Sequence, residues 1–233
     1  MITVISLGGS IVAPDTIDVP YLSQFVSLIE ELLAEDQSRK FIFVVGGGAP
    51  ARLYQKAFRE VTCAAKLPIS NMDDNADWLG IMATRLNAYL IKSLFSRHCP
   101  NDIVVDPTKV DVFTGRILVA AGWKPGFSSD NDAVLLAKLF SAKTVINLSN
   151  IEKVYTADPK TDINAKPIDA ISWKDFRVMV GDVWTPGKNV PFDPIASANA
   201  ELYDIKVICA AGHDLQNLKK IINGEAFTGT SIG

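Results

Sequence analysis

An uninterrupted apolar run at residues 41–45, Phe-Ile-Phe-Val-Val, constrains the fold of this chain more than any other segment. A strand with no polar position is typical of a parallel sheet that is covered on both faces. A second apolar run occupies residues 2–7, and between the two runs apolar residues recur at helical spacing from residue 20 to residue 35. The order strand, helix, strand predicts a βαβ unit.

The same alternation continues along the rest of the chain. Apolar spacing and breaker residues predict helices at 50–65, 75–94, 173–180, from 193 or 194 to 203, and 214–223. A further helix should run from the end of a loop at 122–131 to residue 140. Asn75 is the expected cap of the second helix, and Gly224 follows the last one. They predict strands at 103–105, 117–121, 144–148 and 206–209. We therefore expect a single α/β unit over residues 1–233, a three-layer α/β/α sandwich around a mainly parallel central sheet.

Charge and cysteine content exclude several classes of protein. The formal net charge is −3, so the chain lacks the broad basic surface that non-specific nucleic-acid binding uses. No apolar run approaches the roughly 18 residues of a membrane span, and the apolar N-terminus, broken by Gly8 and Gly9, resembles a buried strand rather than a signal peptide. Three scattered cysteines and two histidines indicate neither a disulfide framework nor a metal site. We expect a cytoplasmic protein without nucleic-acid or membrane partners.

Two glycine-rich turns follow the first two predicted strands. Gly8-Gly9-Ser10 comes after the first strand and residues 46–48, all glycine, come after the second. Glycine lets main-chain N–H groups approach phosphate oxygens and tolerates the positive φ angles of anion-binding turns. Neither turn has the dinucleotide GxGxxG or the Walker GxxxxGK[ST] spacing. Both turns could be simple strand-to-helix connections, but together, and with Arg52 one helical turn later, they favour phosphate binding.

Three further segments carry polar groups that suit a nucleotide. Asp77 begins a stretch of polar groups on an otherwise apolar predicted helix. It could accept hydrogen bonds from a sugar or base, or it could stabilise the N-terminus of that helix through the helix dipole. The loop from Trp123 to Asp132 combines hydrogen-bond donors, a cation and two carboxylates, and such loops are usually functional. Residues 149–159 offer an aromatic ring, amide and hydroxyl groups, and a carboxylate.

In their order along the chain, these segments resemble the amino acid kinase family and, within it, the archaeal-type uridylate kinases. The resemblance covers essentially the whole chain, and its most specific part is the run Val-Tyr-Thr-Ala-Asp-Pro at 154–159. The matching segments are Gly8-Gly9-Ser10, residues 46–48 with Arg52, residues 84–88, Pro125-Gly126, residues 154–159 and residues 189–194.

The resemblance implies a lobe of about residues 1–141 that binds the acceptor and a lobe of about residues 142–233 that binds ATP, with Mg²⁺ between them. It implies acceptor contacts from Gly47, Asp77, Trp123, Lys124, Pro125, Gly126, Phe127, Ser128 and Ser129. It places Ser6, Gly8, Gly9, Ser10, Gly48 and Arg52 around the transferring phosphates. It assigns the adenosine part of ATP to Ser149, Asn150, Tyr155 and Asp158.

The chain departs from the family pattern at two cations. Many relatives have a lysine at the position of Ser6, and another lysine often occupies the position of Ala198. We take Lys188 as the catalytic substitute together with Arg52, with Lys124 and Lys153 as alternatives, although each could be a surface lysine.

The acceptor loop also leaves two carboxylates as candidates for the organising catalytic group. It is about two residues longer than the common Thr-Thr-Asp form of the family, so either Asp130 or Asp132 could take this role. We favour Asp132, because it directly precedes the predicted helix, and leave Asp130 as a supporting or surface residue.

The reaction that the resemblance implies is transfer of the ATP γ-phosphate to UMP, which gives UDP and ADP in pyrimidine nucleotide biosynthesis. Phosphoryl transfer needs mainly positioning and charge neutralisation, so no activated nucleophile is required. The family also implies a homo-oligomer, a hexamer. Two alternatives remain: a kinase with another small phosphate or carboxylate acceptor, and a nucleotide-binding or storage protein of weak activity, which the missing lysines would explain.

Overall fold

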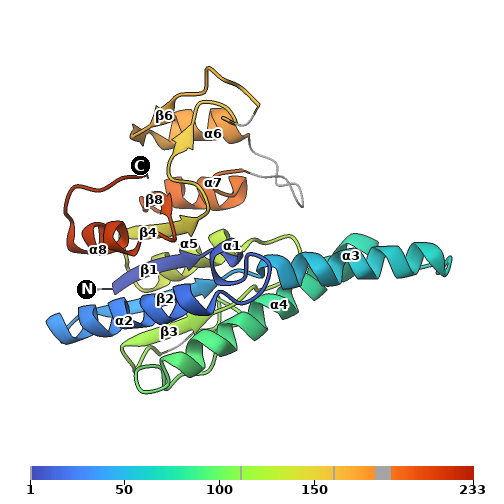
Figure 1. The fold of residues 1–233 in the computed structure, drawn as a ribbon, viewed down its shortest axis with the longest axis horizontal. Coiled ribbons are helices and arrows are strands. Elements are labelled where there is room, and N and C mark those ends of the chain that lie inside the picture. The colour runs from blue at the N-terminus through green and yellow to red at the C-terminus, as the bar shows by residue number, and fades with distance from the viewer. Residues whose placement is uncertain (1, 111, 160, 182–189) are drawn as a thin grey trace.

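A seven-stranded sheet forms the centre of the computed structural model, which describes residues 2–110, 112–159, 161–181 and 190–233 (Figure 1). The strand order is β3-β2-β1-β4-β8-β9-β7. The strands are β1 (Ile2–Leu7), β2 (Lys40–Val45), β3 (Ile117–Ala120), β4 (Thr144–Ser149), β7 (Ala170–Ile171), β8 (Lys206–Ala211) and β9 (Thr230–Ile232). Neighbouring strands pair in parallel, except that β9 runs antiparallel to β8. The predicted mainly parallel sheet is confirmed.

The helices alternate with these strands along the chain. They are α1 (Gly9–Val12), α2 (Val19–Glu35), α3 (Gly48–Ala64), α4 (Met72–Leu94), α5 (Ser129–Leu139), α6 (Trp173–Val180), α7 (Pro194–Leu202) and α8 (Leu215–Asn223). A separate antiparallel pair, β5 (Val154–Tyr155) and β6 (Pro167–Ile168), lies outside the main sheet. In Figure 1, α3 and α4 run side by side beyond the end of the sheet. None of the described helices is long and apolar enough to cross a bilayer.

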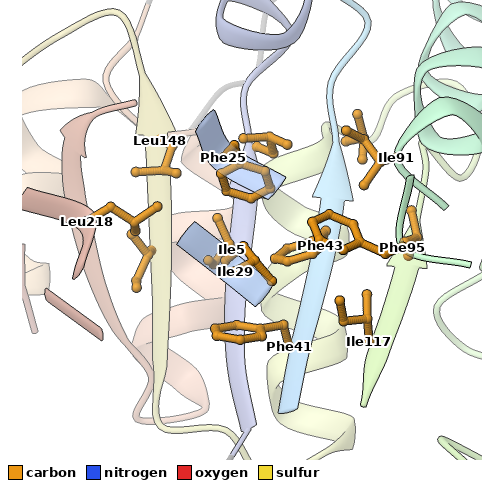
Figure 2. Packing of buried hydrophobic residues seen from close by; sticks show 14 of the residues in the cluster. Ile5, Phe25, Ile29, Phe41, Phe43, Ile91, Phe95, Ile117, Leu148 and Leu218 are labelled. Carbon is orange, nitrogen blue, oxygen red and sulfur yellow. The ribbon is translucent and has the colours of Figure 1, made fainter. Parts of the chain in front are cut away.

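Two hydrophobic cores, one on each face of the sheet, explain the apolar run in β2. Phe41 and Phe43 point to one face, where they pack with Phe25 of α2 and with residues of α4 and α8 (Figure 2). Ile42 and Val44 point to the opposite face and pack with residues of α5, α6 and α7. Every position of the strand is therefore buried, as a sheet covered by helices on both faces requires. This arrangement confirms the three-layer α/β/α sandwich.

Two predicted elements differ from the structure. The helix expected at 75–94 begins at Met72, and Asn75 is not its cap, because its side-chain amide donates to the Ser70 carbonyl (3.2 Å). Residues 103–105 form no strand but only a single parallel bridge from Val104 to Ala120. The chain leaves the sheet edge soon after this bridge, because Asp106 closes a turn by accepting the N–H of residue 108 (3.0 Å).

Candidate active site

The residues predicted for the site gather at the carboxyl edge of the parallel strands. β1 lies between β2 and β4, so strands that come later in the chain lie on both of its sides. In open α/β sheets, ligands bind at such a switch point, outside the carboxyl ends of the strands. Gly8 follows β1 directly, Ser10 lies in the one-turn helix α1, Gly46 follows β2, and Asn150 follows β4. The two glycine-rich turns therefore lie at the same edge, as expected.

The two glycine-rich turns are in direct main-chain contact. The Gly8 N–H donates to the carbonyl of Leu148 at the end of β4 (2.9 Å). A Cβ atom on Gly9 would lie 2.0 Å from the Gly48 nitrogen, and one on Gly46 would lie 2.4 Å from the Gly9 nitrogen. Gly48 also has a φ of +64°, a backbone conformation that glycine adopts without strain. The close approach of these turns therefore requires glycine for packing alone, and phosphate binding by them stays a prediction.

Asn87 of α4 supports the second glycine turn. This buried side chain donates from Nδ2 to the carbonyl of Gly46 (2.9 Å) and to that of Gly47 (3.1 Å). Two carbonyl groups at the site are thereby satisfied without blocking the main-chain N–H groups of the turn. A buried amide in an otherwise apolar helix stripe is the signal in the sequence that could have identified this role.

α4 also holds the acceptor loop, residues 122–128. Thr84 Oγ1 accepts the N–H of Gly122 (2.8 Å), and Asp77 Oδ2 accepts the N–H of Gly126 (3.0 Å). Since α4 begins at Met72, Asp77 lies beyond the first turn of the helix, so the alternative role of Asp77 at the helix N-terminus is wrong. The contact with the loop explains its position, and a contact with the acceptor stays a prediction.

The acceptor loop carries a cation between two aromatic rings. The ring centroids of Trp123 and Phe127 are 5.0 Å apart, and Lys124 Nζ lies 4.0 Å from the first centroid and 4.9 Å from the second. Pro125 lies within the same loop, and Ser128 ends it by capping α5, where its hydroxyl accepts the N–H of residue 131 (3.3 Å). The predicted loop residues thus form one compact surface, except for Ser129, which is the first residue of α5.

The structure separates the roles of the two candidate carboxylates. We expected Asp132 directly before the helix. α5 begins instead at Ser129, so both aspartates lie in its first turn. Asp130 Oδ1 accepts the hydroxyl proton of Ser6, the residue two positions before the first glycine turn (3.0 Å). Asp132 instead accepts the N–H of Trp123 with Oδ2 (3.1 Å) and is completely buried. The reason given for preferring Asp132 is therefore wrong.

Burial raises the pKa values of the carboxyl groups around the N-termini of α5 and α7. It raises the pKa of Asp130 to about 6, a shift that the hydrogen bond from Ser6 opposes and the charge of Asp193 increases. It raises the pKa of Asp132 to about 7, opposed by the hydrogen bond from the Trp123 N–H and increased by neighbouring carboxylates. The pKa of Asp193 is raised by the same cause. These groups form an acidic cluster that would attract a cation.

Residues of α7 that the sequence did not point to complete this side of the site. Asp193 caps α7 by accepting the N–H of Ala196 with Oδ1 (2.7 Å). Asn199 Nδ2 donates to Asn131 Oδ1 (2.7 Å) and so connects α7 with α5. Ala198, at the position of the missing lysine, directly precedes Asn199 in the helix. Asn131 and Asn199 are 68 positions apart, and no local pattern in the sequence pairs them.

The residues predicted for the adenosine part of ATP lie on and after β4. Ser149 ends β4, and its carbonyl accepts the N–H of residue 212 (2.8 Å), while Asn150 is exposed directly after the strand. Tyr155 is half-buried in β5, and Asp158 is exposed in the turn that follows. The structure thus places Ser149 and Asn150 at the same edge as the glycine turns. Nucleotide contacts by the four residues stay predictions.

The candidate cations differ in how they are engaged. Arg52 is exposed on α3 and donates from Nη2 to the Pro14 carbonyl (3.1 Å). Lys153 forms an ion pair with the exposed side chain of Asp169, and its role as a substitute for a missing lysine stays a prediction. Lys188 lies outside the described residues. Lys124, on the acceptor loop, has no carboxylate partner in the part of the chain that the structure describes.

The donor set of the site fits a metal ion only in part. Within residues 2–110, 112–159, 161–181 and 190–233, no group of three or more His, Cys, Asp or Glu side chains could hold a metal ion. Mg²⁺ prefers oxygen ligands and is usually bound by one or two carboxylates together with substrate phosphates. The acidic cluster around Asp130 therefore fits an ion that arrives on nucleotide phosphates, and not one that is caged by protein.

Comparison with known proteins shows what the whole chain is similar to. Residues 1–211 match the model of the Amino acid kinase family. The uridylate kinase of Archaeoglobus fulgidus is 33% identical over 236 residues, which cover 100% of this chain and 100% of that relative. The uridylate kinase of Hyperthermus butylicus is 32% identical over 227 residues, which cover 95% of this chain and 94% of the relative.

The structure agrees with these matches. The crystal structure of uridylate kinase from Archaeoglobus fulgidus aligns with a TM-score of 0.82 at 33% identity and covers 100% of both chains. The crystal structure of UMP kinase from Bacillus anthracis aligns with a TM-score of 0.75 at 18% identity, which shows the shared fold alone.

Proposed function

This chain belongs to the amino acid kinase family, and we propose that it is a uridylate kinase, which transfers the γ-phosphate of ATP to UMP and releases UDP and ADP. The observation that carries the proposal is the full-length similarity, in sequence and in structure, to proteins named uridylate kinase. These matches do not favour another small acceptor or a purely nucleotide-binding role. The reaction is a step of pyrimidine nucleotide biosynthesis, which we place in the cytoplasm.

We assign the two substrates to the two parts of the sheet. UMP binds to the lobe of about residues 1–141, against the acceptor loop, Gly47 and Asp77. ATP binds to the lobe of about residues 142–233, with its adenosine near the end of β4. The transferring phosphate then lies over the contact between the two glycine turns, where main-chain N–H groups and the short helix α1 face the carboxyl edge of β1.

Asp130 is the residue that we assign as the organising carboxylate, in place of Asp132. It accepts the hydroxyl proton of Ser6 of β1, lies in the first turn of α5, and has its pKa lowered by a hydrogen bond with the main chain of Asp193 at the start of α7. It can therefore hold elements of both lobes in one geometry, and phosphoryl transfer depends mainly on such positioning. Mg²⁺ bound with ATP would supply charge neutralisation here, with Asp130 as its protein ligand.

Arg52 is the cation that we assign to the phosphates. In the described part of the chain, its only polar partner is the Pro14 carbonyl, which lies just after α1. The remaining N–H groups of its guanidinium can bind phosphate oxygens in a bidentate manner. Lys188 stays a further candidate for the catalytic cation.

We also propose that the protein is a homo-oligomer, a hexamer as in the family. Large apolar side chains are exposed along α3 and α4, and patches of this kind often mark protein–protein interfaces. Leu86 of α4 is 70% exposed and Leu53 of α3 is 66% exposed. The other exposed apolar residues of these helices are Tyr54, Val61, Trp78, Met82, Tyr89 and Leu94.

A coupled assay of ADP release across a panel of nucleoside monophosphates tests the proposed reaction. We expect turnover with UMP in the presence of ATP and Mg²⁺, and little turnover with purine monophosphates. Turnover with another acceptor but none with UMP would refute the substrate and keep the class of enzyme. ATP binding by calorimetry without transfer to any acceptor would instead support the nucleotide-binding alternative.

A further inference from the structure

Three side chains from two helices accept main-chain N–H groups of the acceptor loop. The N–H groups of residues 122, 123 and 126 donate to Thr84, Asp132 and Asp77, respectively. Thr84 and Asp77 belong to α4, which is partly exposed at this point, whereas Asp132 belongs to α5 and lies in the protein interior. The hydrogen bond from the Trp123 N–H to Asp132 is therefore the contact of the loop that water cannot replace in the folded protein.

Asp132 is poorly suited to a purely structural role. It is completely buried, and its Oδ1 atom has no hydrogen-bond partner among the described residues. The titratable groups that act on it among the described residues, Asp130, Asp106 and Asp193, are all acidic. An ionised carboxylate that is buried among acidic groups costs free energy, which a neutral residue at the same position avoids.

Asp132 acts on the loop through the peptide groups of Trp123. The N–H of Trp123 donates to Asp132, and its carbonyl accepts a hydrogen bond from Arg85 Nη2 (3.2 Å). The Trp123 ring in turn packs against Phe127 and carries Lys124 over its face. The position of the Trp123 main chain therefore sets the orientation of the two rings and of the ammonium group. Aromatic faces suit a planar base and an ammonium group suits a phosphate, which are the two parts of a nucleoside monophosphate.

We propose that Asp132 is the positioning residue for the acceptor: through the Trp123 N–H it fixes the surface formed by Trp123, Lys124 and Phe127 to which the nucleoside monophosphate binds. Asp132 itself touches neither substrate. The inference rests on the proposed function, because it deepens the role of the same loop. It explains why an energetically unfavourable carboxylate occupies this buried position.

Two variants and one control test the proposal. Asp132→Ala removes the acceptor of the Trp123 N–H, and we expect KM for UMP to rise by about tenfold or more, as expected for loss of a hydrogen bond to a charged group, with KM for ATP nearly unchanged. Asp132→Asn keeps an oxygen at the same place and should restore most of the affinity for UMP. Asp132→Asn should not lower the melting temperature, whereas Asp132→Ala should lower it moderately, because the Trp123 N–H loses its acceptor. The control Ser172→Ala also removes a side-chain acceptor of one backbone N–H, at the start of α6, and should lower the melting temperature without changing KM.

Hydrogen–deuterium exchange separates this inference from the proposed function, because it needs no substrate. In the unliganded full-length protein, amides at residues 122–128 should exchange faster in Asp132→Ala than in the wild type, and at nearly wild-type rates in Asp132→Asn. Unchanged exchange in Asp132→Ala, or a fall in its melting temperature with KM for UMP unchanged, would overturn the proposal. A wild-type protein that does not phosphorylate UMP would refute the proposed function, and the exchange rates would still decide the role of Asp132.

Discussion

Substitution Asp132→Asn should make the folded protein more stable above neutral pH, and the structure gives the size of the effect. Burial raises the pKa of Asp132 from the ordinary value of 3.8 to about 7. Each unit of such a difference between folded and unfolded states corresponds to about 1.4 kcal/mol, so the upper limit is roughly 4 kcal/mol. We expect about half of this value, because protein interiors screen charge better than a dry medium does.

The direction of the pH dependence follows from proton binding. Between about pH 4 and pH 7, the folded chain keeps a proton on Asp132 that the unfolded chain has released, so the free energy of unfolding falls as pH rises through this range. Above about pH 7 both states are ionised and the full penalty is present. The Asn variant lacks this group, so its stability should exceed that of the wild type at pH 8 and approach it near pH 4.

Urea unfolding followed by circular dichroism at several pH values between 4.5 and 8.5 measures this difference. The raised pKa values of Asp130 and Asp193 leave some pH dependence in both proteins, so the difference between the two curves reports the loss of Asp132 together with its effect on these neighbours. Asp36, whose pKa is lowered mainly by hydrogen bonds from Ser38, gives a control of opposite sign: the stability of Asp36→Asn relative to the wild type should fall as pH rises from acid to neutral. Parallel curves for wild type and Asp132→Asn would refute the reasoning about burial.

Four further substitutions test other parts of the structure. Gly9→Ala should destabilise the protein by about 3 kcal/mol or more in thermal unfolding, since the new Cβ would lie 2.0 Å from the Gly48 nitrogen. The control Gly224→Ala, at an open position with a φ of +74°, should cost only about 1 kcal/mol. Arg52→Ala should leave the melting temperature within about 1 °C, because the side chain is exposed, but lower kcat/KM at least about tenfold. Leu86→Glu should shift light scattering toward a 25.3 kDa particle, and an unchanged oligomer would exclude this face of α4 from the interface.

The fold could be predicted from the sequence wherever an element was long enough to show a period. Phe41 and Ile42 belong to an apolar run that indicates burial on both faces, and the structure sends alternate residues of that run into the two cores. β7 and β9 are too short for periodicity to reveal them. Residues 103–105 are apolar and β-branched, as strands often are. Only Val104 pairs with β3, at Ala120, and the turn at Asp106 begins two residues later.

The site was predictable in its glycine turns and less so in its carboxylates. The choice between Asp130 and Asp132 depended on where α5 begins, and a shift of a few residues changes the direction in which a helical side chain points. Ser128 was the available signal, since serine is a preferred N-cap residue and its hydroxyl does cap α5. Contacts such as Asp130 with Ser6, 124 positions apart, arise only from tertiary packing and leave no trace in local sequence.

The position of β9 between β8 and β7 has a consequence for how the chain assembles. Thr230–Ile232 pairs with both neighbours, and the Thr230 hydroxyl also accepts the N–H of Val154 in β5 (2.8 Å). Of the segment that contains β5, β6, β7 and α6, only β7 belongs to the main sheet, where it pairs with β9. We therefore expect β7 to join the sheet only after β9 has left the ribosome, and a nascent chain lacking β9 should expose β7 to proteases.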